Sequence, residues 1–201
     1  MARPGVTFGG SAYGRTVTEQ QRYDVVREYP SFELRRYPEH LVAEVEVEGS
    51  FESAGSTAFR PLVSYIGGRN DTATGLAMTA PVVQRRDEPL PHDVETETTG
   101  VGKGRYVVAF VLPDDVTSET VPVPNDETVR VRVVPEEYAV VSRFSGRWTA
   151  SSYRQKVVAL EAESASAGYV AAGSTRFARF DPPWTPWFMR RNEIVIPVIA
   201  P

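Results

Sequence analysis

The chain has 201 residues, two histidines and no cysteine, and its formal net charge is −4 at pH 7. The lack of cysteine excludes disulfides, thiolate metal sites and cysteine nucleophiles, and the interspersed charges argue against a nucleic-acid partner. We expect a single domain, because half of this length would bury too little of its surface to be stable alone.

Residues 1–21 are rich in glycine, serine, threonine and arginine and contain no apolar stretch of the signal-peptide type. We therefore expect a mobile leader there, followed by a folded domain at 22–201. The longest apolar run, residues 106–112, is far shorter than the about 20 residues of a membrane-spanning helix. These features predict a soluble, cytoplasmic protein without a membrane span.

The first half of the domain is expected to contain strands and one helix. Period-two alternation of apolar residues predicts strands at 23–28, 32–37, 41–47, 75–83 and 106–112. A helix capped by Ser50 or Ser53 and ended by Gly67 follows the third strand. Its core-facing positions recur at helical spacing: Phe51, Ala54, Ala58, Leu62 and Tyr65. The polar segment 84–105 is expected to be a mobile loop.

The second half of the domain follows the same pattern. Strands are predicted at 129–134, 138–144, 175–180 and 193–199. Thr149 is expected to cap a second helix, with Trp148 and Tyr153 placed as a hydrophobic staple. The core-facing positions of this helix are Tyr153, Val157, Leu160 and Ser164.

Two segments of the sequence, 97 residues apart, resemble copies of one unit. The shift relates Pro38 to Pro135, Gly49 to Gly146 and Phe51 to Trp148. We therefore expect an α+β fold in which two antiparallel-sheet-plus-helix repeats, about 22–112 and 127–199, are related by a pseudo-two-fold axis. The seam between such repeats is a natural ligand groove.

A second apolar stripe runs along the first helix, beside its core-facing side. It comprises Gly55, Phe59, Val63 and Ile66, and the glycine would allow another group to approach the backbone closely. The stripe lines a groove in one interpretation and is additional core in the other. Pro61 is expected to kink or restart the helix.

The most unusual segment is the loop at 180–193, where three prolines fix the backbone. It carries large apolar side chains next to two cations: Trp184, Trp187, Phe188, Met189, Arg190 and Arg191. Aromatic rings beside guanidinium groups suit a flat, apolar ligand that bears carboxylates. The alternative is a loop that caps the fold, with Arg190 or Arg191 paired to Glu193.

Five short motifs resemble the SOUL heme-binding protein family. They are FELRRY at 32–37, EGSF at 48–51, AMTAPV at 77–82, FSGRW at 144–148 and DPPWTPWFMRRNE at 181–193. The resemblance implies a distorted β-barrel with two flanking helices and a hydrophobic cleft that binds heme or other tetrapyrroles. It also implies kinship in fold with the effector-binding domains of bacterial drug-responsive regulators.

The resemblance carries over to some residues and not to others. It places the cleft at Phe59 and Val63 and the closing loop at 184–191. Arg36 stands where some animal members have a proposed histidine ligand, and serines stand where others have cations for the propionates, namely Ser56 and Ser64. A different pose would use Arg60, Arg69, Arg190 or Arg191.

Iron ligation and catalysis receive little support from the residue types. His40 lies in a turn and His92 in the polar loop, so neither is expected to bind iron, and Met78 is assigned to the core rather than to a ligand. We expect no metal site and no catalytic residues. The leading hypothesis is a heme or tetrapyrrole carrier or buffer, with weak or no axial ligation. Its site residues are Phe59, Arg60, Val63, Met78, Trp184, Trp187, Phe188, Met189, Arg190 and Arg191.

Two other functions stay open at this point. The first is a cleft protein that binds, or even hydrolyses, another flat apolar small molecule, with a carboxylate and a tyrosine as general base and acid. The second is a pure interaction module.

Overall fold

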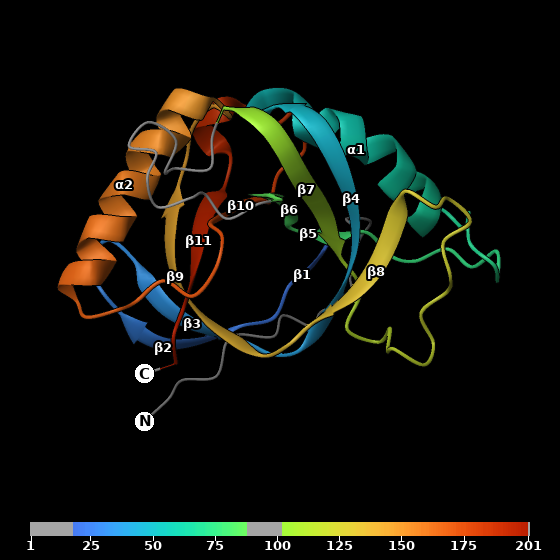
Figure 1. Cartoon of the computed structure of the whole chain (residues 1–201), viewed down its shortest axis with the longest axis horizontal. Helices are drawn as coiled ribbons and strands as arrows, with labels where there is room; N and C mark the ends of the chain where they lie inside the picture. Colours follow the sequence, from blue (N-terminus) through green and yellow to red (C-terminus); the bar gives the residue numbers. More distant parts are fainter. Residues whose placement is uncertain (1–17, 88–101, 201) are drawn as a thin grey trace, which may run out of the picture.

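The computed structural model describes residues 18–87 and 102–200. Nine antiparallel strands form one curved sheet in the order β2-β3-β9-β11-β10-β6-β7-β4-β8, and two helices cover its outer face (Figure 1). The outermost strands, β2 and β8, each pair with one neighbour only. The α+β class is confirmed, but the sheet is open, so the expected barrel is not closed.

The elements have the following bounds. The strands are β1 (Glu19–Gln20), β2 (Asp24–Glu28), β3 (Glu33–Tyr37), β4 (His40–Ser50), β5 (Thr79–Ala80), β6 (Val82–Arg86), β7 (Lys103–Val111), β8 (Val129–Val134), β9 (Glu137–Phe144), β10 (Arg176–Arg179) and β11 (Asn192–Val198). The helices are α1 (Phe51–Ile66), α2 (Ala150–Ser166) and the short 3-10 helix η1 (Trp187–Met189). None of the helices in the described ranges is long and apolar enough to cross a lipid bilayer.

Apart from the edge strand β2, the strand order is symmetric about the junction of β10 and β6. From that junction outward, one side reads β10-β11-β9-β3 and the other reads β6-β7-β4-β8. When 97 is added to the residue numbers of β3, the result is 130–134, which lies inside β8. The same shift takes β4 to 137–147, a range that begins at the first residue of β9. This order is what a two-fold relation between the halves would produce. The duplication itself stays a prediction, to be tested by superposing the two halves.

The main core lies between the sheet and the two helices. All five positions assigned to the core-facing side of α1 are at most 1 % exposed. On α2, Tyr153 and Val157 are fully buried, while Leu160 is 2 % and Ser164 5 % exposed. Strand β7 turns Tyr106, Val108 and Phe110 toward this core. Its alternate residues, Val107, Ala109 and Val111, therefore point to the opposite, concave face of the sheet.

Side chains at the helix ends set the positions of both helices. Ser50 caps α1 in a reciprocal arrangement with Ser53, and Thr149 caps α2, as expected. The α1 helix runs without interruption to Ile66, so the restart predicted at Pro61 is wrong. Its buried face continues past the proline, and this packing holds the two halves of the helix in line.

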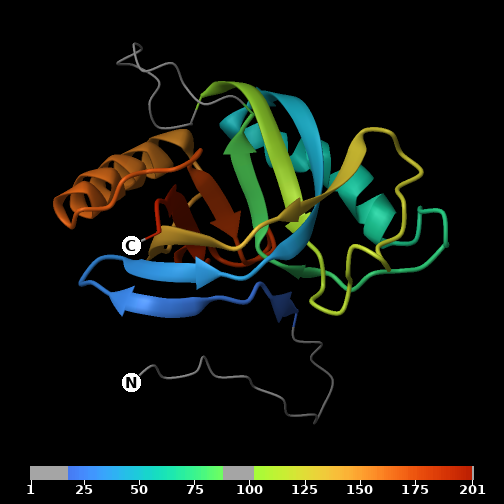
Figure 2. The ribbon, with the colours of Figure 1, turned by 60° about the horizontal axis from the view of Figure 1, so that its bottom comes forward.

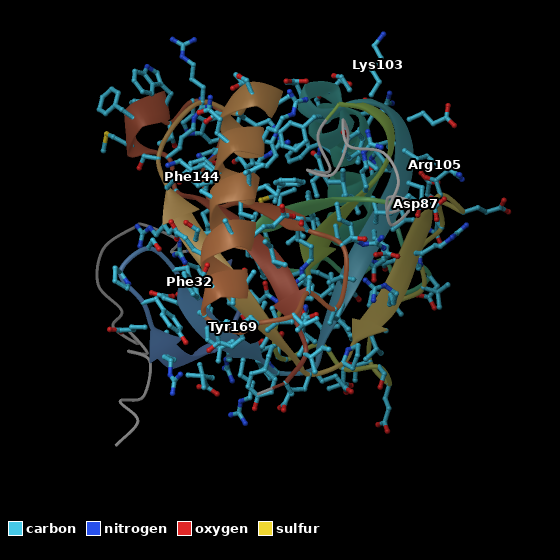
Figure 3. The ribbon with its side chains drawn as sticks, turned by 60° about the vertical axis from the view of Figure 1, so that its left-hand side comes forward. Phe32, Asp87, Lys103, Arg105, Phe144 and Tyr169 are labelled. Atoms are coloured by element: carbon cyan, nitrogen blue, oxygen red, sulfur yellow. The ribbon has the colours of Figure 1, made fainter. Side chains whose placement is uncertain are left out.

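Aromatic contacts anchor α2 near both of its ends. Figure 3 shows Phe144 near one end and the pair of Phe32 and Tyr169 near the other. The ring of Phe144 lies 5.0 Å from that of Tyr153, and the rings of Phe32 and Tyr169 lie 6.4 Å apart, edge to face. The helix is thus fixed relative to β9 and β3.

The N-terminal segment at 19–23 lies on the concave face, away from both helices (Figure 2). Strand β1 pairs in parallel with β5 over two residues only. Residues 19–21, which the sequence analysis assigned to the leader, are therefore part of the fold. The side chain of Gln21 continues the contact across the sheet, because it lies 3.0 Å from the His40 ring nitrogen Nε2.

Candidate functional site

The second stripe of α1 is buried at its ends and open in the middle. Gly55 and Ile66 belong to the core, whereas Val63 is half-buried and Phe59 remains 47 % exposed. The Phe59 ring packs edge to face on Phe110, with centroids 5.8 Å apart. The core interpretation therefore holds for the ends of the stripe, and the centre presents an apolar surface to solvent.

Gly55 allows close approach, as expected, and the approaching group is Arg179 of this same chain. A Cβ at position 55 would lie 2.7 Å from Nη1 of Arg179. The guanidinium stacks on the Trp148 ring and donates to Gln84 Oε1 at 2.8 Å. Burial lowers the pKa of Arg179 to about 9, and Tyr153 and Glu52 offset this effect only in part. This side chain fills the space between α1 and Trp148 at the level of Gly55.

A hollow of about 500 Å³ opens beside the exposed centre of α1. Its lining residues are Arg60, Pro61, Ser64, Arg69, Asn125, Asp126 and Thr128. Within the described part of the chain, neither guanidinium of this hollow forms a hydrogen bond or an ion pair. Asp126 is held by Thr128, whose hydroxyl and amide lower the pKa of the carboxyl, with a smaller contribution from Arg69. Two cations are thus available to an anionic ligand.

The closing loop presents its apolar side chains to solvent. Trp184 is 81 % exposed, Phe188 61 % and Met189 64 %, while Trp187 is 49 % exposed and lies under the guanidinium of Arg147. None of the loop residues 184–191, all within the described ranges, lines the hollow beside α1. The structure therefore does not bring the loop and the α1 stripe into one pocket.

The two arginines of the closing loop have different partners. Arg190 donates from Nε to the Thr185 carbonyl at 2.8 Å and also binds the Pro183 carbonyl, so it stabilises the loop itself. Arg191 points to the concave face and donates to Glu193 Oε1 at 2.7 Å. These bonds are of the kind expected from the structural interpretation of Arg190 and Arg191, whose role in ligand binding stays a prediction.

Met78 lies immediately before β5 and is 48 % exposed. Its assignment to the core is therefore wrong. The apolar run that contains it alternates only weakly, and the next residue, Thr79, is buried in its place. No described contact joins Met78 to Phe59 or to the loop.

His40 has both ring nitrogens engaged. Nδ1 lies 2.9 Å from the Pro38 carbonyl oxygen and Nε2 lies 3.0 Å from Nε2 of Gln21. Burial lowers the pKa of His40 below its ordinary value. The ring thus donates from Nδ1 and accepts at Nε2, and neither nitrogen is directed toward the α1 surface. His92 lies outside the described residues, and within those residues no group of three metal-ligating side chains occurs.

The concave face holds a buried charge cluster that the sequence analysis did not find. Arg35, from the FELRRY motif, is 2 % exposed and donates to Glu193, which is 1 % exposed, at 2.8 and 3.3 Å. Arg191 binds the same carboxylate, and burial raises the pKa of the adjacent Tyr37 to about 12. Arg35 and Glu193 are 158 residues apart, so no local pattern could have paired them.

Comparisons with known proteins identify relatives in sequence and in fold. A family model described as SOUL heme-binding protein matches residues 18–197. Heme-binding protein 1 of Xenopus tropicalis is 26 % identical over 196 residues, covering 93 % of this chain and 92 % of that protein. The corresponding protein of Xenopus laevis is 26 % identical over 171 residues, covering 82 % of each.

Solved structures with the same fold come from other groups of proteins. The C-terminal domain of EcmrR superposes with a TM-score of 0.63 at 18 % identity, covering 85 % of this chain and 98 % of that one. A hydrolase from Listeria innocua gives a TM-score of 0.55 at 12 % identity, covering 87 % and 94 %. At these identities the likeness establishes the fold alone.

Proposed function

Because the chain belongs to the SOUL heme-binding protein family, we propose that it binds heme or a related tetrapyrrole and acts as a carrier or buffer. We place the site on the outer face of α1, where an apolar ring and free cations are adjacent. The observation that carries this placement is the pairing of Phe59 with Arg60. Phe59 keeps about half of its surface exposed above the core, and Arg60 lines the hollow and has no ion-pair partner among the described residues.

The chemistry of this surface suits the two parts of the ligand. The macrocycle would lie against Phe59 and Val63, and its carboxylates would meet Arg60 and Arg69. These two arginines replace the cations that are missing at Ser56 and Ser64. Iron ligation by the protein would be weak or absent, since His40 is engaged elsewhere.

The energetics of face contact predict a moderate affinity. Burying about 400 Å² of apolar macrocycle at roughly 25 cal/mol per Å² contributes on the order of 10 kcal/mol. The loss of translational and rotational freedom consumes about 4 kcal/mol or more of this sum. Dissociation constants in the micromolar range follow, which suit a buffer that releases its cargo.

The test is a substitution on α1 with a matched control on α2. Phe59→Ala should weaken the binding of hemin and of iron-free protoporphyrin alike, by about 1 to 2 kcal/mol, because face contact is lost. Val158→Ala removes an equally exposed apolar side chain, 53 % exposed, from α2 and should leave both affinities unchanged. Equal effects of the two substitutions, or none, would contradict the placement.

We do not extend the proposal to hydrolysis. The buried carboxylate with tyrosines nearby is Glu193, and its oxygens accept hydrogen bonds from Arg35 and Arg191. A carboxylate held in this way is a poor general base. Tyr37, with its pKa raised to about 12, is a weaker general acid than an ordinary tyrosine.

A further inference from the structure

The concave face of the sheet has an apolar floor that the described residues leave partly unfilled. Its buried side chains form two separate clusters, one with Tyr37, Ala139, Val141, Ala178 and Val195, the other with Val42, Ala109, Val111 and Val134. A cavity of about 40 Å³ is lined by members of both clusters. This volume holds about three water-sized positions. Small side chains such as Ala109 and Ala178 leave this space open, whereas the helix-facing side of the same strands is filled by aromatic rings.

The wall of this cavity is charged, and its charge is not balanced. The arginines on it are Arg35, Arg85, Arg132 and Arg176, and the glutamates are Glu44 and Glu193. Their outer partners are Arg191, Glu33 and Glu137. Five arginines against four glutamates leave one positive charge in surplus. The surplus positive charge lies next to Glu44, because this single carboxylate pairs with two arginines, Arg85 at 3.4 Å and Arg132 at 3.3 Å.

The N-terminal segment forms the roof of the cavity. Gln21 and Tyr23 line it, and Gln20 accepts a hydrogen bond from Arg191 at 3.0 Å. The segment is attached by the pairing of β1 with β5, by the ion pair of Arg22 with Asp114 and by Tyr23, which stacks against Arg35. None of these contacts involves the helix-facing core, so the segment can open locally without disturbing that core, which gives a ligand a way in.

We propose that this cavity is a second ligand site, which takes a short apolar carboxylate of about four to six heavy atoms. The apolar body lies on Ala109 and Val83, and the carboxylate meets the surplus cation at Arg85 and Arg132. The carboxylate of the ligand is not expected to bind at Arg35, because Glu193 already neutralises this arginine. The cavity is far too small for a macrocycle, so this site is independent of tetrapyrrole binding on α1.

Calorimetric titration with isobutyrate, and with its neutral and cationic analogues isobutyramide and isobutylamine, tests the proposal. Isobutyrate should bind to the wild-type protein at least about tenfold more tightly than either analogue. Ala109→Leu should abolish isobutyrate binding by filling the cavity while leaving hemin affinity unchanged. Hemin binding is measured in parallel, so a failure of the tetrapyrrole proposal is seen separately.

Two substitutions of exposed arginines test the proposal even if the Ala109→Leu variant does not fold. Arg132→Gln should weaken isobutyrate binding about tenfold. Arg130→Gln is the matched control, since Arg130 lies on the same strand and pairs with Glu46 at 2.9 Å but does not line the cavity. Isobutyrate that fails to bind, binds no better than isobutyramide, or is equally affected by both substitutions would overturn the proposal.

Discussion

The rings of Phe51 and Trp148 stack face to face, with centroids 5.1 Å apart and planes inclined by 11°. These two residues occupy the same position of the 97-residue register, so equivalent points of the two halves touch at the seam. Glu52 strengthens the contact, because its carboxylate accepts the backbone N–H of Ala150 at 2.8 Å. The starts of both helices are thereby fixed to each other and to Arg179, which stacks on Trp148.

Trp148→Ala should lower the free energy of unfolding by about 3 kcal/mol. The substitution removes the ring that packs on Phe51 and Tyr153 and that covers Arg179. Urea unfolding followed by circular dichroism measures the change. Trp184→Ala is the control, since a residue 81 % exposed should alter stability by no more than about 0.5 kcal/mol.

Arg60→Gln and Arg69→Gln should each weaken hemin binding by about 1 to 2 kcal/mol and leave the binding of its dimethyl ester nearly unchanged. The reason is that the ester lacks the carboxylates that a guanidinium would bind. Arg154→Gln, on the exposed side of α2, serves as control for net charge. An equal loss for hemin and its ester would show that the arginines act only through the shape of the hollow.

Trp187→Ala tests whether the closing loop contributes to the tetrapyrrole site. If it does, the affinities for hemin and iron-free protoporphyrin should fall together by roughly 1 to 3 kcal/mol. The midpoint of thermal unfolding should change only slightly, because Trp187 is half exposed. Unchanged affinities would confine the site to α1, in line with the separation of the loop from the hollow.

His40→Ala should leave hemin affinity within a few-fold of the wild type. Both ring nitrogens are already engaged, one by Pro38 and the other by Gln21. The visible spectrum of the hemin complex provides the measurement. A sharp low-spin Soret band that disappears in the variant would show that His40 binds iron after rearrangement.

The lowered pKa of His40 predicts that the stability of the protein depends on pH. Burial lowers the pKa of His40 below 6.5, so below that pH the unfolded chain binds the proton more readily than the folded one. Arg176 and Arg132 act in the same direction, and the Pro38 carbonyl and Glu137 oppose it. The free energy of unfolding should therefore fall as the pH drops from about 7 to 5, and less so in His40→Gln.

The comparison of wild type with His40→Gln isolates this residue, because His92 is present in both proteins. Urea unfolding at pH 7.5, 6.0 and 5.0 gives the three differences needed. A variant that loses stability toward acid pH as steeply as the wild type would contradict the assignment.

The sequence predicted most elements because their signals are local. The alternation at 41–47, the caps at Ser50 and Thr149 and the apolar face of α1 all depend on residues within one or two turns of each other. Strand order required more, since pairs such as β3 with β9 join segments about 100 residues apart. The symmetric order could have been anticipated only from the repeat.

The candidate site was predicted in part, for a different reason. Phe59 and Arg60 are consecutive residues of one helix, so their side chains leave it about 100° apart and lie on adjoining faces at the same level of α1. The separation of the closing loop from that helix depends on how Arg190 and Arg191 are bound, and Arg191 is directed away by Glu193. The space beside Gly55 could be predicted from the sequence, but Arg179, which fills it, lies 124 residues further along the chain.

An open sheet has two free edges, and each is a template onto which a second chain could add a strand. Strand β2 carries an irregularity between Val25 and Arg27 that interrupts a regular ladder. Strand β8 carries Arg130 and Arg132, and a second chain that paired with this strand would have to accommodate their charges. These features oppose the addition of a further strand at either edge, so the sheet can stay open without closing into a barrel.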